Sequence, residues 1–159
     1  MVKHIVNLDR LKRDQLIKKA TPLFTYHVLI RGTAYPVEVI EVVQRDGLRL
    51  YFLSSDEFFQ APDNPYVNPS NPAQPLDPYR NPANGEKLTE DSLFFSIAAP
   101  TALVELSKSG HLQAKELILH LQDWETAAVA RAVKRAQTAP ALTSIRCVLT
   151  IHNPYDKPL

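Results

Sequence analysis

Three runs in the first third of the chain decide the fold: FTYHVLIR (24–31), YPVEVIEVVQ (35–44) and LRLYFLS (48–54). Each run is rich in β-branched and aromatic residues, which favour extended strands. The gaps between the runs hold Gly32-Thr33 and Arg45-Asp46-Gly47, which are typical of tight turns because glycine and aspartate tolerate positive φ angles. The sequence therefore predicts an antiparallel meander of three strands over residues 24–54.

The middle strand of this meander does not alternate cleanly between apolar and polar residues. Val37 and Val39 share a face with Glu41, whereas Ile40 shares the opposite face with Glu38. One extra residue in a strand reverses the faces that follow it. We therefore expect a β-bulge near Ile40 that places both glutamates on the outside.

The rest of the chain predicts three helices and one further strand. Helices are expected at residues 8–20, 101–109 and 124–137, the second starting at Pro100 and closed by Gly110, and the third capped by Asp123. The apolar run TSIRCVLTIH (143–152) predicts a buried strand. Residues 112–121 fit a helix and a strand equally well, so this segment remains open.

These elements predict a single α+β domain over residues 1–159. Its antiparallel sheet would combine the meander with strand 143–152, joined in one version by residues 113–121, and helices would cover it. A small closed barrel of the oligonucleotide-binding (OB) type is the alternative, because five short strands and one helix suit that fold.

Composition excludes several classes of protein. The 159 residues include 45% hydrophobic and 22% charged residues, with a net charge of +1, which argues against a strongly basic nucleic-acid tail or a disordered acidic chain. The single Cys147 cannot form an intramolecular disulfide. The sequence has neither a signal-peptide core nor an apolar run of membrane-spanning length. We therefore expect a cytoplasmic protein, or a component of a macromolecular particle, without a membrane partner.

Residues 60–86 form a segment rich in proline and asparagine. Its prolines recur every three or four residues, so that neither a helix nor a central strand is expected there. A preorganised proline-rich chain loses little entropy on docking, so we interpret the segment as an extended loop or arm that binds a protein partner or a second copy of the chain. The candidate partner-binding residues are Pro65, Tyr66, Pro69, Pro72, Pro75 and Tyr79.

Basic side chains suggest a nucleic-acid partner as an alternative. They cluster on the predicted helices 8–20 and 124–137, where they could neutralise phosphates. The candidate residues are Lys12, Arg13, Lys18, Lys19, Arg131, Lys134 and Arg135.

Catalytic signatures are not evident in the sequence. The four glycines are isolated, so they form no phosphate-binding loop. His27, His120 and His152 lie in strand-like runs and would suit zinc if they met across one sheet. We nevertheless predict no catalytic, cofactor or metal residues, and no cofactor. The function predicted is a non-catalytic protein-interaction module, such as an assembly component, inhibitor or adaptor. A nucleic-acid-binding accessory protein is the alternative, and a hydrolase-like enzyme with a histidine-based site is third.

Overall fold

A computed structural model describes residues 17–59, 82–113, 116–136 and 144–152. The chain divides into two compact units, residues 1–91 and 92–159, which are described separately. Within the described residues, no helix is long and apolar enough to span a membrane. Strands and helices occur together and one sheet is antiparallel, so the mixed α+β class is confirmed.

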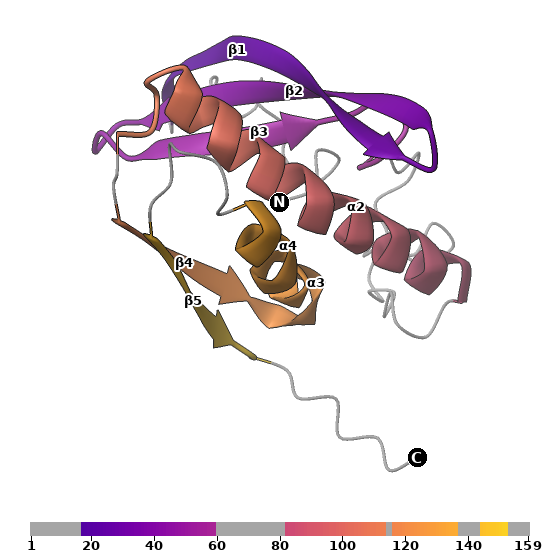
Figure 1. Cartoon of the computed structure of the whole chain (residues 1–159). Helices are drawn as coiled ribbons and strands as arrows, with labels where there is room; N and C mark the ends of the chain where they lie inside the picture. Colours follow the sequence, from indigo (N-terminus) through magenta and orange to yellow (C-terminus); the bar gives the residue numbers. More distant parts are fainter. Residues whose placement is uncertain (1–16, 60–81, 114–115, 137–143, 153–159) are drawn as a thin grey trace, which may run out of the picture. The chain divides into compact units, whose positions relative to one another are not determined.

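The first unit holds the predicted meander. Strands β1 (Ile17–Ile30), β2 (Thr33–Gln44) and β3 (Arg49–Ser54) form an antiparallel sheet in the order β1-β2-β3, as Figure 1 shows. The side chains of Val37, Val39 and Val42 on the central strand are fully buried. The hydrophobic pattern of β2 therefore sets the register of both neighbouring strands.

The two hairpin turns use residues with left-handed backbone. Arg31 and Gly32 have φ angles of 49° and 87°, so the first turn lies one residue earlier than the predicted Gly32-Thr33. This two-residue turn matches the right-handed twist of the strands. In the second turn, Gly47 has a φ angle of 90°, and the amide of Leu48 donates to Asp46 Oδ1 at 3.0 Å. The prediction of a tight Asp-Gly turn is confirmed.

The predicted bulge lies on the neighbouring strand. The register of β1 shifts between Pro22 and Phe24, opposite Ile40 and Val39, whereas β2 pairs with β3 without a shift. Proline has no amide hydrogen to donate to the ladder, which favours an irregularity at that point.

The helix predicted at residues 8–20 is wrong at its end, because residues 17–20 belong to β1. The rest of that predicted helix lies outside the described residues.

Helix α2 (Pro82–Lys108) is much longer than the helix predicted at residues 101–109. Its first residues, 82–86, fall in the segment 60–86 that the sequence predicts as a proline-rich loop, and residues 60–81 of that segment lie outside the description. Pro82 suits the start of a helix, since the first turn needs no amide donor there. Pro100 lies inside the helix, not at its start as predicted. A proline removes one backbone hydrogen bond, and a helix held by packing can continue past it. Gly110 closes this segment with a φ angle of 78°, as predicted.

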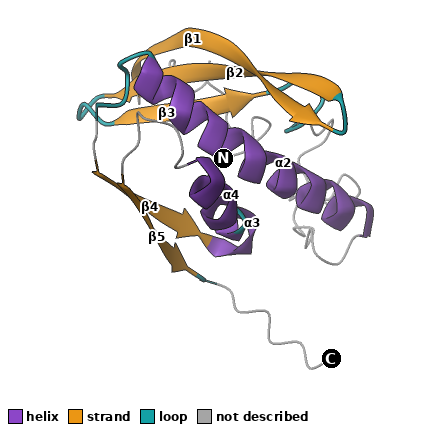
Figure 2. Cartoon of the chain, in the orientation of Figure 1, coloured by secondary structure: helices purple, strands orange, loops and turns teal. Residues whose placement is uncertain are grey.

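The second unit contains a parallel pair of strands. Strand β4 (Glu116–Gln122) and strand β5 (Ser144–Thr150) pair in parallel, joined through helices α3 (Asp123–Ala127) and α4 (Val129–Ala136). Figure 2 shows the two strands and the helices that connect them. The expectation that strand 143–152 joins the meander is therefore wrong. A strand–helix–strand segment supplies the long crossover that parallel pairing requires.

The same unit resolves two other sequence predictions. The ambiguous segment 112–121 forms a strand over residues 116–122, and the helix predicted at 124–137 is split at Ala128. The core of the unit comprises Leu121, Val129, Val133 and Ile145, and the partly buried Phe95, Leu103 and Leu117 pack against it. The apolar faces of α2, α4 and the strand pair thus close one small core.

Candidate active site at the carboxyl ends of the parallel strands

The carboxyl ends of β4 and β5 bring polar side chains together in the second unit. Gln122 ends β4 and Asp123 follows it, while Thr150 ends β5 and His152 lies two residues beyond. Ligands of open α/β sheets bind outside the carboxyl ends of parallel strands, where the backbone turns away. This edge is therefore the candidate functional site.

A set of short hydrogen bonds connects the two strand ends. The backbone amide of His152 donates to Asp123 Oδ1 at 2.6 Å, and His152 Nε2 lies 2.6 Å from Gln122 Oε1. Because an amide oxygen only accepts, Nε2 of His152 is the donor in its contact with Gln122 Oε1. His120 Nε2 lies 2.6 Å from Thr150 Oγ1, which adds a second link between the strands.

The backbone at Asp123 is strained. Its φ angle is 58°, in the left-handed region that residues with a Cβ seldom occupy, although aspartate tolerates it better than most. The prediction that Asp123 caps the following helix is wrong, since Gln122 holds that position without a side-chain cap. The Asp123 carboxylate instead accepts from His152, which lies 29 residues further along the chain. Strain of this kind persists where surrounding contacts hold it, often at functional sites.

The chemistry of this edge suits hydroxyl-bearing ligands. It combines an amide, a hydroxyl and two imidazoles with one carboxylate, and these groups together donate and accept hydrogen bonds. His120, Gln122 and His152 are exposed to solvent. A sugar, whose hydroxyls each donate and accept, fits this inventory better than an apolar or purely anionic ligand.

A metal centre finds no support within the residues that the structure describes. They contain no group of three or more histidine, cysteine or acidic side chains that could hold an ion. His120 and His152 both lie near the edge of the parallel pair, but His27 belongs to β1 of the first unit. The histidine trio considered from the sequence is therefore divided between the two units.

The remaining sequence candidates are placed as follows. Lys12 and Arg13 lie outside the described residues. So do the six predicted partner-binding residues, which are Pro65, Tyr66, Pro69, Pro72, Pro75 and Tyr79. Lys18 and Lys19 are exposed on β1, not on a helix. Arg131 and Lys134 are exposed on α4, which also includes Arg135. Binding of nucleic acid or of a protein by any of these residues stays a prediction.

The sequence reasoning missed Gln122 and Thr150, and it gave Asp123 only a structural role. The available signal was the order of elements: strand 116–122, helices 123–127 and 129–136, and strand 144–150 follow one another as in a parallel βαβ unit. Had residues 112–121 been assigned as a strand, the polar residues directly after each strand would have marked the site.

Comparison with known proteins identifies the family. The sequence pattern described as "Starch synthase catalytic domain" matches residues 3–157. The glycogen synthase of Xanthomonas axonopodis pv. citri is 29% identical over 127 residues, which cover 79% of this chain and 23% of the relative. The glycogen synthase of Pseudothermotoga lettingae is 32% identical over 112 residues, covering 70% of this chain and 18% of the relative. No solved structure matches.

These relatives correct the functional prediction. The chain spans only about a fifth of their length (18% to 23%), but the family match runs through both units. A non-catalytic interaction module, inhibitor or adaptor is therefore the wrong class, and the prediction that the chain is not an enzyme falls with it. The sequence shows no catalytic motif, but the lack of a recognisable motif does not exclude catalysis. The chain belongs to the family described as the starch synthase catalytic domain.

Proposed function

We propose that this chain is part of a glycosyltransferase that extends a starch-like or glycogen-like glucan. The observation that carries the proposal is the family match over residues 3–157. The names of the relatives, glycogen synthases, supply the substrate class. Such a reaction transfers a glucosyl group from an activated donor to a hydroxyl of the growing glucan.

The polar edge of β4 and β5 is the part of the chain proposed to contact sugar. The Gln122 amide can donate to one sugar hydroxyl while its oxygen accepts from His152 Nε2. In the tautomer that donates from Nε2, the His152 ring can accept a hydroxyl hydrogen at Nδ1. Asp123, whose carboxylate accepts from the His152 amide, acts as a positioning residue that fixes the two strand ends relative to each other.

Phosphate recognition is not assigned to this edge. A sugar-nucleotide donor carries a diphosphate, which calls for several cations or backbone amides at a glycine-rich turn. The residues that form the described edge include one acidic side chain, Asp123, and no lysine or arginine. We therefore assign to the edge the recognition of glucosyl hydroxyls, in the acceptor or in the sugar part of the donor.

The experiment is a titration of the purified 159-residue chain with maltohexaose, followed by backbone amide NMR. We expect shifts confined to residues 120–123 and 150–152. In His152→Ala and Gln122→Ala, affinity should fall by about fivefold to tenfold, because each change removes about one hydrogen bond of net worth near 1 kcal/mol. His27→Ala, which removes an exposed histidine of β1, should leave the affinity unchanged.

A second readout tests the transfer itself. Incorporation of labelled glucose from a nucleotide-activated donor into maltohexaose is expected to depend on His152 and Gln122 and not on His27. Failure of maltohexaose to shift residues 120–123 or 150–152 would overturn the assignment of this edge.

A further inference from the structure

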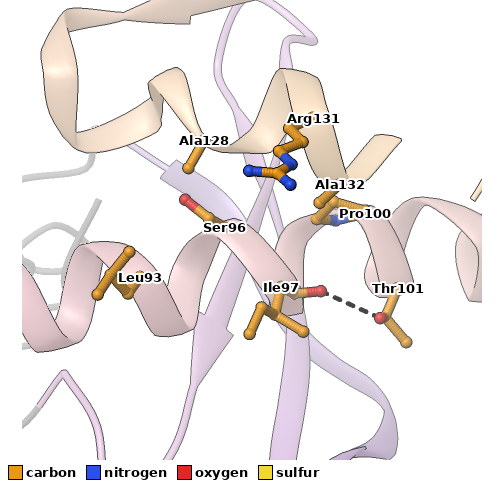
Figure 3. Close-up of a pocket in the computed structure, with 8 residues that line it drawn as sticks. All are labelled: Leu93, Ser96, Ile97, Pro100, Thr101, Ala128, Arg131 and Ala132. Atoms are coloured by element: carbon orange, nitrogen blue, oxygen red, sulfur yellow. Dashed lines mark hydrogen bonds between the residues drawn. The ribbon is translucent and has the colours of Figure 1, made fainter. Parts of the chain in front are cut away.

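A pocket lies between α2 and α4, within the unit of residues 92–159. It has a volume of about 660 Å³, within the range typical of small-molecule sites. Figure 3 shows its walls, with Arg131 reaching from α4 toward α2. Its described lining residues are Leu93, Ser96, Ile97, Pro100, Thr101, Ala128, Arg131 and Ala132.

The α2 wall of this pocket is apolar and faces solvent. Leu93 and Ile97 are 58% and 45% exposed, and they lie one helical turn apart on α2. Ala132 on α4 and Ala128, the residue just before α4, add only methyl groups to the opposite wall. Removing these surfaces from water would favour an apolar ligand, and the small alanines leave room for one.

The hydroxyl groups of the pocket are already engaged. Ser96 Oγ donates to the Ser92 carbonyl at 2.8 Å, and Thr101 Oγ1 donates to the Ile97 carbonyl at 3.1 Å, the bond drawn in Figure 3. Pro100 has no amide hydrogen to offer. The walls therefore provide few groups that could satisfy the many hydroxyls of a sugar.

Arg131 supplies the only formal charge among the eight described lining residues. Within the described parts of the chain, no acidic side chain forms an ion pair with Arg131. A guanidinium group binds a carboxylate through two parallel hydrogen bonds. A single cation does not balance the diphosphate of a sugar nucleotide, so the charge of this pocket matches a monoanion.

We propose that this pocket binds an amphiphilic monocarboxylate, that is, a straight-chain fatty acid of medium length. The alkyl chain lies between Leu93 and Ile97 on one side and Ala128 and Ala132 on the other. The carboxylate pairs with Arg131. This inference is independent of the proposed glucosyl transfer, because none of the pocket residues belongs to the edge of β4 and β5.

The test uses the whole chain and decanoate, kept below its micelle concentration. Backbone amide NMR should show shifts at Leu93, Ile97, Ala128 and Ala132. Decanol, which has the same chain without the charge, should bind at least about tenfold more weakly, since it cannot form the charge-assisted pair. Acetate, which has the charge without the chain, should cause no shifts in this pocket at the same concentration.

Two variants locate the carboxylate. Arg131→Gln should weaken decanoate binding about tenfold and leave decanol binding unchanged, whereas Arg131→Lys should retain part of the affinity. Lys134→Gln removes a neighbouring exposed cation of α4 that does not line the pocket, so it is the matched control and should bind like the original chain. Equal binding of decanoate and decanol, unchanged affinity in Arg131→Gln, or shifts confined to other residues would each overturn the proposal.

Discussion

The two sheets use an aspartate at a strand end in opposite ways. In the antiparallel meander, Asp46 accepts from the amide of Leu48, two residues away, and thereby stabilises only its own turn. In the parallel pair, Asp123 accepts from the amide of His152, 29 residues away. An aspartate side chain thus forms a local hydrogen bond in the hairpin and a long-range one in the crossover. In a crossover, neighbouring strand ends come from distant parts of the chain.

The sheets also differ in how much apolar surface they bury. On β2 of the meander, Val37, Val39 and Val42 are fully buried. In the parallel pair, Ile118 is 69% exposed and Val148 is 51% exposed. Parallel strands are usually covered on both faces, so the parallel pair depends more strongly on the one face that α4 and α2 cover.

We expect the largest loss of stability from a substitution that disrupts the packing on that covered face. Val133 is 1% exposed in the core of the second unit, so Val133→Asp would bury an unpaired carboxylate. We expect a loss of more than about 3 kcal/mol in the free energy of unfolding. Hydrogen exchange should show lost amide protection in β4 and β5, with protection retained in β1 to β3.

The neighbouring residue provides the control for this substitution. Lys134 is exposed on the same helix, so Lys134→Asp places the same side chain in solvent and should cost less than about 1 kcal/mol. Equal losses in the two variants would show that the second unit does not rely on the covered face.

The comparison also explains which parts of the fold the sequence could predict. The meander follows from local signals: strand runs, an Asp-Gly turn and short connections, all within residues 24–54. The parallel pairing depends on residues 116–122, whose alternation of leucines is weakened by the helix-forming residues before it. Because the sequence does not decide between helix and strand in this segment, the meander is the only clear partner it offers for strand 143–152, and this leads to the wrong sheet.

The candidate site could not be predicted from the sequence for a related reason. Asp123 before an amphipathic helix has the pattern of a helix cap, and a single sequence cannot show that its carboxylate contacts residue 152 instead. Gln122 and Thr150 carry no motif of their own, and their importance comes from the register that pairs them. Polar residues at the ends of parallel strands become meaningful only when the strands are known to be neighbours.

Substitutions at Asp123 should separate the long-range link from the backbone strain. Asp123→Ala loses the carboxylate and keeps the left-handed φ angle, so we expect a loss of about 2 kcal/mol. Asp123→Asn keeps an acceptor oxygen and tolerates this backbone, so its loss should stay below about 1 kcal/mol. Asp123→Gly relieves the strain but removes the acceptor, and should fall between the two. Denaturant unfolding measures all three.

The hairpin provides the matched control for the Asp123 series. Asp46→Ala removes one exposed turn hydrogen bond, so it should cost about 0.5 to 1 kcal/mol. It should also leave the amide of His152 unaffected, whereas Asp123→Ala should increase the hydrogen-exchange rate of that amide. If Asp123→Ala leaves that rate unchanged, the link between the strand ends does not hold in solution.

The smallest expected difference between the units appears at alkaline pH. Burial raises the pKa of Tyr26, on β1, well above its ordinary value near 10. Above pH 10 the unfolded chain loses this proton while the folded chain keeps it, so the free energy of unfolding falls as pH rises further. Below pH 10 the tyrosine adds no pH dependence. At pH 11 the loss should be about 1 kcal/mol.

The parallel pair should not share this alkaline loss through a tyrosine, because residues 92–152 contain none. Hydrogen exchange between pH 9 and pH 11, corrected for the intrinsic exchange rate, should therefore show falling protection in β1 to β3 first. Tyr26→Phe changes the stability at neutral pH through its lost hydroxyl, so the informative quantity is the slope of stability against pH. That slope should become shallower in Tyr26→Phe above pH 10. An unchanged slope would assign the alkaline loss to other groups and remove this difference between the two sheets.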